Sequence, residues 1–375
     1  MGLLDYYRQF EDMDQEEVNK GLRERRAREK ALALEQVPVL DLSSTEWPDF
    51  PNSEIVNASI ATARGKVNGY PDRHAGELRG MIAKRHGVDP QQVAVGNGAA
   101  EMLQAAAYAL LGGSGELVTP WPSYPLYPLM ASRAGGKPVA VDSADPEDIL
   151  AAVTEQTRIV MICNPNDPTG TYVPSEHLAG LVAQLPDHVH VLVDEAYVQF
   201  QFAEDEDACL RLVDSFPQLL VFRTFSKVYG LSGLRCGYAV ANPAAASLLE
   251  RIAPVLGVNA LTQSAALQAL KIGDPEVIRR SALVAEQRRR VESALHDLPF
   301  DAPPTQANFV WLRAPEMTGA EIASRLEEEK VLVAPGGPLG AEDHVRASIR
   351  GPAATSRLLE ALEKVASPRG DAAAA

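Results

Sequence analysis

The side chains best suited to chemistry follow short apolar runs that have the character of buried strands. Asp194 ends the run Val189–Asp194, and Lys227 comes just after the run Leu220–Thr224. A carboxylate at the end of a buried strand costs free energy unless it meets a cation. In an open α/β sheet, ligands bind beyond the carboxyl ends of the strands. We therefore expect these two groups to meet in an active site at that edge.

Two more strand ends carry polar or small residues. The turn 164–170 (NPNDPTG) follows one apolar run and presents polar side chains, and the segment 96–101 (GNGAAE) follows another and opens a helix. Small residues at a helix N-terminus let backbone amides approach an anion, so phosphate is the expected guest. Glu101 takes the final Gly/Ala position of a dinucleotide fingerprint, which weakens a dehydrogenase as the alternative α/β reading.

The elements that must position these residues alternate along the chain. Short β-branched runs separated by helical patterns predict a mainly parallel α/β sheet. After about residue 257, long helical patterns with short strands indicate a second, smaller α+β domain. The expected strands are Val93–Val95, Leu117–Thr119, Pro138–Asp142, Arg158–Cys163, Val189–Asp194, Leu220–Thr224 and Cys236–Val240, then Asn308–Leu312, Val331–Val333 and His344–Ile349. The expected helices include Ala99–Leu111, Ser175–Gln184, Ala208–Phe216, Asp274–Leu298 and Thr355–Val365.

Composition narrows the class of protein. The 375 residues suffice for two domains, and 35 basic against 50 acidic residues give a net charge of −15, which argues against nucleic acid as a partner.

The sequence has no apolar run of about 20 residues, so we expect no membrane partner. Met1–Phe10 mixes charged and apolar residues, unlike a signal peptide. Three cysteines without CxxC spacing predict a reduced, cytoplasmic protein. Zinc-site, P-loop and serine-hydrolase motifs are absent, so no metal is expected.

Four segments together resemble the pyridoxal-phosphate (PLP) aminotransferases of fold type I, in the histidinol-phosphate aminotransferase-like branch. They are NPNDPTG at 164–170, DEAY at 194–197, FSKVYGLSGLRCGY at 225–238 and VRASIRG at 345–351. The resemblance implies a large domain with a mainly parallel seven-stranded sheet between helices, plus a smaller α+β domain. The expected limits are a helical arm at 1–36, a segment joining the small domain at 37–58, the PLP-binding domain at 59–257, the small domain at 258–366 and a disordered tail at 367–375.

The resemblance also implies a role for each matching residue. Lys227 would form a Schiff base with PLP and act as general base and acid. Asp194 would pair with the pyridinium nitrogen, and Tyr197 would donate to the phenolic oxygen. Arg346 would bind the substrate α-carboxylate, and Tyr124 would stack on the ring. The cofactor phosphate would lie among Gly98, Ala99, Ala100, Thr224, Ser226 and Arg235, with Tyr70 reaching it from the partner subunit of a homodimer.

The chain departs from that branch at three places. Leu42–Pro48 (LSSTEWP) replaces an Asn-rich motif, and Ala334 stands where an arginine for a substrate phosphate is expected. Asp167 replaces an asparagine that faces the phenolic oxygen. It either is protonated and donates to that oxygen, or stays ionised and turns toward a cation or a backbone amide, and we favour the ionised form. Trp47 is a candidate for the substrate pocket, and Asn308 matches a family position near the substrate.

We accordingly predict a PLP-dependent aminotransferase that moves an amino group between an amino acid, or a close analogue, and a 2-oxo acid. The departure at Ala334 predicts a poor fit for histidinol phosphate. The alternatives are a PLP-dependent decarboxylase resembling the threonine-phosphate decarboxylases, and a PLP-sensing module without turnover. The short N-terminal segment is too small for the basic DNA-binding domain that such a regulator carries.

Overall fold

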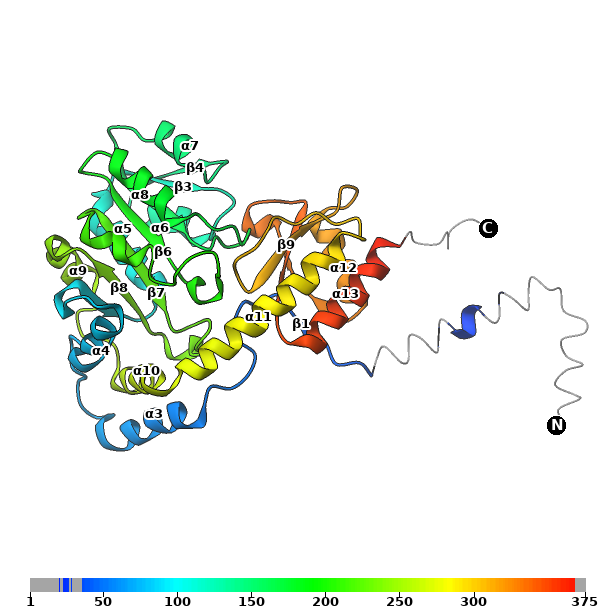
Figure 1. Cartoon of the computed structure of the whole chain (residues 1–375), viewed down its shortest axis with the longest axis horizontal. Helices are drawn as coiled ribbons and strands as arrows, with labels where there is room; N and C mark the ends of the chain where they lie inside the picture. The colour runs from blue at the N-terminus through cyan, green and yellow to red at the C-terminus, as the bar shows by residue number, and fades with distance from the viewer. Residues whose placement is uncertain (1–19, 21–22, 27, 29–35, 368–375) are drawn as a thin grey trace, which may run out of the picture.

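The computed structural model describes residues 20, 23–26, 28 and 36–367 (Figure 1). The predicted helical arm therefore lies mostly outside the described residues; of those that are described, 20, 23–26 and 28 are helical and Gln36 lies in a turn. The predicted tail, apart from Ser367, lies outside them as well. Among the described residues, no helix is long and apolar enough to cross a membrane.

A seven-stranded sheet forms the centre of the larger part of the molecule. Its order is β2-β8-β7-β6-β5-β3-β4; β8 runs antiparallel to both its neighbours, and the pairs from β7 through β4 are parallel. The mainly parallel sheet predicted from the alternating pattern is thus confirmed. The strands are β2 (Val93–Gly96), β3 (Glu116–Pro120), β4 (Lys137–Val141), β5 (Thr157–Cys163), β6 (His190–Asp194), β7 (Leu219–Thr224) and β8 (Gly237–Ala241).

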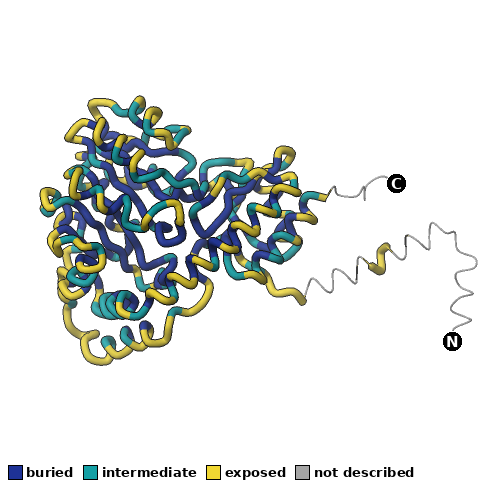
Figure 2. Tube along the Cα trace, viewed as in Figure 1, coloured by how far each residue is buried: buried dark blue, intermediate teal, exposed yellow. Residues whose placement is uncertain are grey.

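Helices cover both faces of this sheet, which explains why its inner strands are mostly apolar. Alternate residues of β6 point to opposite sides: Val193 belongs to one buried cluster and Leu192 to the other. The cluster around Leu192 includes residues of α5 (Ala99–Leu111), α6 (Leu126–Arg133) and α9 (Ala246–Ile252). The cluster around Val193 includes residues of α7 (Pro146–Ala151) and α8 (Ser175–Gln184). Figure 2 shows the buried strands inside and the exposed helix surfaces outside.

One predicted helix is wrong. The segment Ala208–Phe216 forms a short 3₁₀ helix over Leu210–Asp214 and is not an α-helix. Its apolar residues Leu210 and Val213 are fully buried in the larger cluster, so the apolar spacing marked burial correctly. Residues three positions apart lie on the same side of a 3₁₀ helix and also of an α-helix. The spacing of apolar residues therefore does not distinguish the two helix types.

The C-terminal unit is built on small sheets and three helices. β9 (Phe309–Arg313), β12 (His344–Ser348) and β11 (Ala334–Pro335) form an antiparallel sheet, and β1 (Leu40–Asp41) pairs in parallel with β10 (Val331–Leu332). The predicted strand Val331–Val333 is thus shorter than expected: it ends at Leu332, and β11 in the other sheet begins only at Ala334. The helices are α11 (Asp274–Leu295), α12 (Gly319–Glu328) and α13 (Pro352–Ala366). Figure 1 shows α11 running between the two units.

The predicted domain limits remain a prediction, and the contacts of one helix bear on them. α10 (Ala260–Ile272) follows residue 257 but packs on α3 (Ser53–Lys66) and α4 (Gly76–His86). The Ser59 hydroxyl donates to the Leu261 carbonyl at 2.7 Å, and the Ser264 hydroxyl donates to the Ala58 carbonyl at 3.1 Å. By these contacts α10 packs with the helices beside the large sheet, while α11 contacts both α10 and α13.

Candidate active site

A cavity of about 220 Å³ opens where β5, β6 and β7 end and α5 begins. It brings together residues from distant parts of the chain, as expected for the carboxyl edge of a parallel sheet. Most predicted site residues line it, and Gly98, Arg346 and Tyr70 are not among the lining residues. The lining residues are Glu46, Ala99, Ala100, Tyr124, Cys163, Asp167, Asp194, Ala196, Tyr197, Thr224, Ser226, Lys227, Ser232 and Arg235.

One end of the cavity is built for an anion. α5 begins at Ala99, so its first backbone amides have no partner within the helix, and Ala99 and Ala100 line the cavity. Gly98 has a φ of 95°, and a Cβ there would lie 2.4 Å from Nη2 of Arg235. Glycine therefore lets the guanidinium come close to the helix start. The Ser226 hydroxyl lies 3.3 Å from Nη1 of Arg235 and accepts from the Thr224 hydroxyl at 2.9 Å.

The other end holds a buried carboxylate. Asp194 ends β6, accepts from the Tyr127 hydroxyl at 3.0 Å and accepts from the Ala196 amide at 3.1 Å. Burial raises the pKa of Asp194 to about 6, because the two hydrogen bonds only partly replace the lost water. A cation beside this carboxylate would stabilise its ionised form. Tyr127, which is completely buried on α6, was not predicted as a site residue.

Lys227 lines the same cavity and belongs to a chain of hydrogen bonds. Its ammonium donates to Oγ1 of Thr45 at 2.6 Å, and that hydroxyl lies 3.0 Å from the Tyr197 hydroxyl. Tyr197 donates to Asp167 at 2.7 Å, so Thr45 is the donor in its bond with Tyr197. Burial lowers the pKa of Lys227 and raises that of Tyr197, because an apolar surrounding disfavours the charged form of each group. Thr45 was missed from sequence because its segment departs from the family motif.

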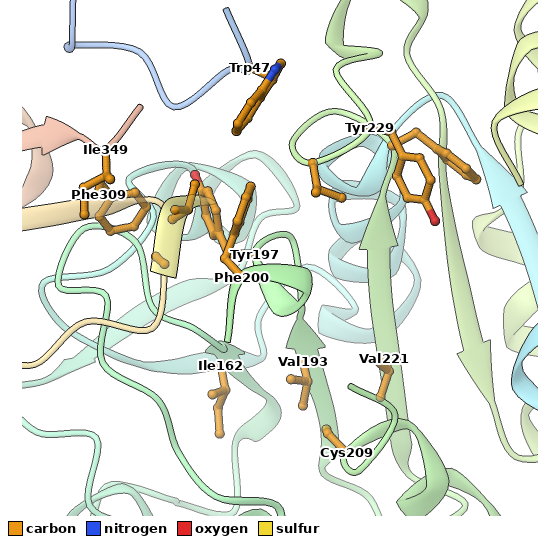
Figure 3. Packing of buried hydrophobic residues seen from close by; sticks show 14 of the residues in the cluster. Trp47, Ile162, Val193, Tyr197, Phe200, Cys209, Val221, Tyr229, Phe309 and Ile349 are labelled. Atoms are coloured by element: carbon orange, nitrogen blue, oxygen red, sulfur yellow. The ribbon is translucent and has the colours of Figure 1, made fainter. Parts of the chain in front are cut away.

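Arg346 reaches the same group of residues from the C-terminal unit. Its Nη1 donates to Oδ1 of Asp167 at 2.5 Å, and its Nη2 donates to the Ser43 carbonyl at 3.1 Å. Its Cζ lies 5.5 Å from the centre of the Phe309 ring, which meets the Tyr197 ring edge-on at 5.1 Å. Figure 3 shows Tyr197 and Phe309 in one buried cluster. Asp167 thus turns toward a cation, as the sequence analysis expects for its ionised form.

Of the remaining candidates, Trp47 does not lie where it was predicted. Glu46 lines the cavity and Trp47 does not, because the Trp47 ring stacks 4.7 Å from Cζ of Arg280 in the core. Asn308 donates to the Thr45 carbonyl at 3.0 Å and so positions the loop that carries Thr45. Tyr70 is 88% exposed, away from the cavity of its own chain.

The fold and the site together indicate the class of enzyme to which this protein belongs. A mainly parallel seven-stranded sheet carries a buried carboxylate after β6, a buried lysine after β7 and an anion site at the start of α5, which is the arrangement of the fold type I enzymes. The chain belongs to the family "Aminotransferase class I and II", whose model matches residues 37–364. It is therefore a PLP-dependent aminotransferase, as predicted.

Individual relatives agree with this assignment. The chain is 37% identical to an aromatic amino acid aminotransferase of Corynebacterium efficiens, over 87% of this chain and 93% of that protein. Its fold is similar to that of histidinol-phosphate aminotransferase from Sinorhizobium meliloti, solved with pyridoxal-5'-phosphate, with a TM-score of 0.77, 26% identity and coverage of 89% and 94%. It is also similar to L-threonine-O-3-phosphate decarboxylase from Porphyromonas gingivalis, with a TM-score of 0.75, 25% identity and coverage of 87% and 99%.

Proposed function

We propose that this cavity holds PLP and that the enzyme moves an amino group between an amino acid, or a close analogue, and a 2-oxo acid. The observation that carries the proposal is that one cavity contains two different binding sites. One is an anion site at the start of α5, and the other is the buried carboxylate of Asp194, whose pKa is raised by burial. A molecule with a phosphate at one end and a basic ring nitrogen at the other matches both. When bound, PLP supplies an electron-accepting ring that stabilises negative charge at the substrate carbon bearing the amine.

The chain's own residues would hold PLP and move protons around it. The amides of Ala99 and Ala100 and the side chains of Thr224, Ser226 and Arg235 would bind the phosphate. Asp194 would keep the ring nitrogen protonated, and Tyr124 would contact the ring face. Lys227, whose pKa is lowered by burial, would bond covalently to the cofactor and later carry a proton to and from the substrate.

Thr45 and Tyr197 form the hydrogen-bonded path beside that lysine. The Thr45 hydroxyl accepts from Lys227 and donates toward Tyr197, so it holds the amine in a defined orientation. Tyr197 would donate to the phenolic oxygen of PLP in place of its present bond to Asp167, or would remain shared between the two acceptors. Both arrangements keep Lys227, Thr45 and Tyr197 in contact.

The substrate side of the proposal rests on two residues that face each other across a strand pair. Arg346 on β12 would bind the substrate carboxylate, and Ala334 on β11 is its register partner. An alanine there leaves no charge-assisted donor for a substrate phosphate at that position. The aromatic amino acid aminotransferase of Corynebacterium efficiens supports an aromatic side chain as the group that this end of the site accepts.

A homodimer completes the proposal. Tyr70 is almost fully exposed and lies close in sequence to Val67 and Ile60, which are also exposed apolar residues. Burial of such side chains against a second copy would be favourable. Tyr70 of the partner subunit would then reach the phosphate, as the family resemblance implies. We also propose a cytoplasmic location, which the reduced state of the three buried cysteines supports.

A trapping experiment tests the covalent link. Borohydride reduction of the purified protein should fix the cofactor on the peptide that contains Lys227. Lys227→Ala should retain PLP through the phosphate site but lose transamination, whereas Lys137→Ala, at a lysine whose side chain is 71% exposed, should behave like the wild type. Recovery of the label on another lysine would end this assignment.

Half-reaction screening identifies the substrate class. The protein is loaded with PLP, offered a panel of amino donors, and followed for conversion of the cofactor to its amine form. We expect aromatic amino acids to react and histidinol phosphate to react about ten- to a hundredfold less efficiently, because one charged hydrogen bond is missing. Release of CO2 without that conversion would instead support the decarboxylase alternative, which shares this fold.

A further inference from the structure

The arginine proposed to receive the substrate carboxylate already holds a carboxylate of the chain itself. Arg346 donates through Nη1 to Asp167 and through Nη2 to the Ser43 carbonyl. Its Nε is buried and has no hydrogen-bond partner among the described residues. The side chain of Asp167 is 3% exposed and that of Arg346 12% exposed, so water does little to screen the pair.

This arrangement matters because a carboxylate is recognised best when two parallel N–H donors of a guanidinium reach its two oxygens. With one oxygen of Asp167 on Nη1, an incoming carboxylate must either displace Asp167 or bind with a poorer set of donors. The incoming carboxylate is also repelled by the negative charge of Asp167. An asparagine at this position has nearly the same shape but carries no charge, so it would compete far less for the guanidinium.

Resting on the proposed role of Arg346, we propose that Asp167 is a specificity-determining residue that competes with the substrate α-carboxylate for Arg346. The competition weakens the binding of carboxylate-bearing substrates and leaves amines without an α-carboxylate unaffected. The enzyme therefore distinguishes amino acids from the corresponding amines less sharply than Arg346 alone would allow. As long as Tyr197 donates to Oδ2, it reinforces the competition by holding the carboxylate of Asp167 in place.

A second carboxylate in the cavity offers a matched control. Glu46 lines the same cavity, and its side chain accepts from the Ser44 hydroxyl at 3.1 Å and makes no salt bridge with Arg346 among the described residues. Glu46→Gln thus removes one negative charge near the substrate without freeing the guanidinium. Comparison with Asp167→Asn separates the general effect of negative charge from competition for Arg346.

The test uses ligands that cannot react. Binding of 3-phenylpropanoate and of 3-phenylpropan-1-ol to the purified full chain is measured by calorimetry, with the cofactor bound and again after its removal. We expect Asp167→Asn to bind the carboxylate at least about tenfold more tightly than the wild type, since a charge-assisted bidentate pair becomes available. The alcohol should bind equally to both, and Glu46→Gln should change carboxylate binding by less than about threefold, as expected for a charge that makes no direct contact.

A double-mutant cycle locates the effect. In an Arg346→Leu background, Asp167→Asn should give no gain in carboxylate affinity, because the contested donor is gone. Equal carboxylate affinities for the wild type and a folded Asp167→Asn would overturn the proposal, as would an equal gain for Glu46→Gln. These measurements do not depend on covalent cofactor binding, so failure of the Lys227 assignment would show in the trapping experiment instead.

Discussion

Tyr127 shows how a single residue can tune the site without lining its cavity. It is buried on α6, and its hydroxyl donates to Asp194, the carboxylate proposed to meet the cofactor ring. That hydrogen bond lowers the pKa of Asp194, while burial raises it to a net value of about 6. Tyr127 is therefore a positioning residue, which keeps Asp194 oriented and helps to keep it ionised.

We predict that Tyr127→Phe weakens PLP binding by about tenfold or more, which is the usual effect of losing a hydrogen bond to a charged group. The ionised Asp194 binds the cofactor best, so affinity should rise with pH through the pKa of this carboxyl. Removal of the hydrogen bond raises that pKa, and the pH midpoint of binding should move upward. Spectroscopic titration with PLP at a series of pH values measures both effects.

Two comparisons complete that experiment. Tyr108→Phe, at an exposed tyrosine of α5, should leave the affinity and the midpoint unchanged. Asp194→Asn removes the titrating carboxyl, so the part of the pH dependence that it contributes should disappear there. An unchanged midpoint in Tyr127→Phe would show that this hydroxyl does not act on Asp194.

At the scale of elements, the approach of β8 to the start of α5 shapes the anion site. A Cβ at Gly237 would lie 2.5 Å from the Ala99 nitrogen and 2.9 Å from the Arg223 carbonyl oxygen. Both neighbours are backbone atoms, so neither can move like the end of a flexible side chain. The absence of a side chain at this position therefore lets the helix begin directly beside the strand.

We predict that Gly237→Ala destabilises the protein by about 1–3 kcal/mol, the usual cost of forcing extra atoms into a packed region. It should also weaken PLP binding, because the start of α5 must shift. Gly180→Ala is the opposite case: Gly180 lies within α8, with no atom within 4 Å of its Cβ position. That substitution should stabilise the protein by about 0.5–1 kcal/mol. Urea unfolding curves of the two variants should move in opposite directions.

At the scale of the whole molecule, one buried arginine joins several elements. Arg223 on β7 has no exposed surface and bonds to Glu195 at 2.7 Å and to Asp207 at 2.6 Å. Asp207 also accepts from Nδ1 of His86, whose Nε2 lies 2.9 Å from the Tyr238 hydroxyl. The network thus connects α4, β7, β8 and the loop after β6, next to Asp194.

We predict that Arg223→Met destabilises the fold by about 3–5 kcal/mol, because it leaves buried carboxylates without their cation. Hydrogen bonding and the nearby cations hold the pKa of Asp207 below its ordinary value despite burial. Its contribution to stability is therefore present above the unfolded pKa, near about 4, and is lost as the pH falls further. The difference in the free energy of unfolding between the wild type and Arg223→Met should therefore become smaller at acidic pH.

Denaturant unfolding at neutral and acidic pH checks this prediction. Arg211→Met is the control, since Arg211 and its partner Asp205 are both more than half exposed. Exposed pairs of this kind contribute at most about 1 kcal/mol. Similar losses in the two variants would show that the buried network has no special weight in stability.

The sequence by itself determined the local features of this protein. The β-branched runs and the helical patterns between them predicted the parallel sheet, because sheets covered on both faces need apolar strands. Asp194 and Lys227 could be placed at one edge of the sheet, because the carboxyl ends of parallel strands lie at the same edge. Where apolar spacing allowed two answers, as in Ala208–Phe216, sequence alone chose the wrong helix type.

The tertiary structure decided which side chains meet. Lys227 bonds to a threonine 182 positions away, Tyr127 lies 67 positions from Asp194, and Arg346 lies 179 positions from Asp167. No periodic pattern in the sequence encodes such pairs, because the partner of a polar side chain depends on how distant helices and strands pack against one another. The buried interior then makes each pairing obligatory, since an unpartnered charge there is costly. For that reason the occupation of Arg346 by Asp167 became visible only in the folded chain.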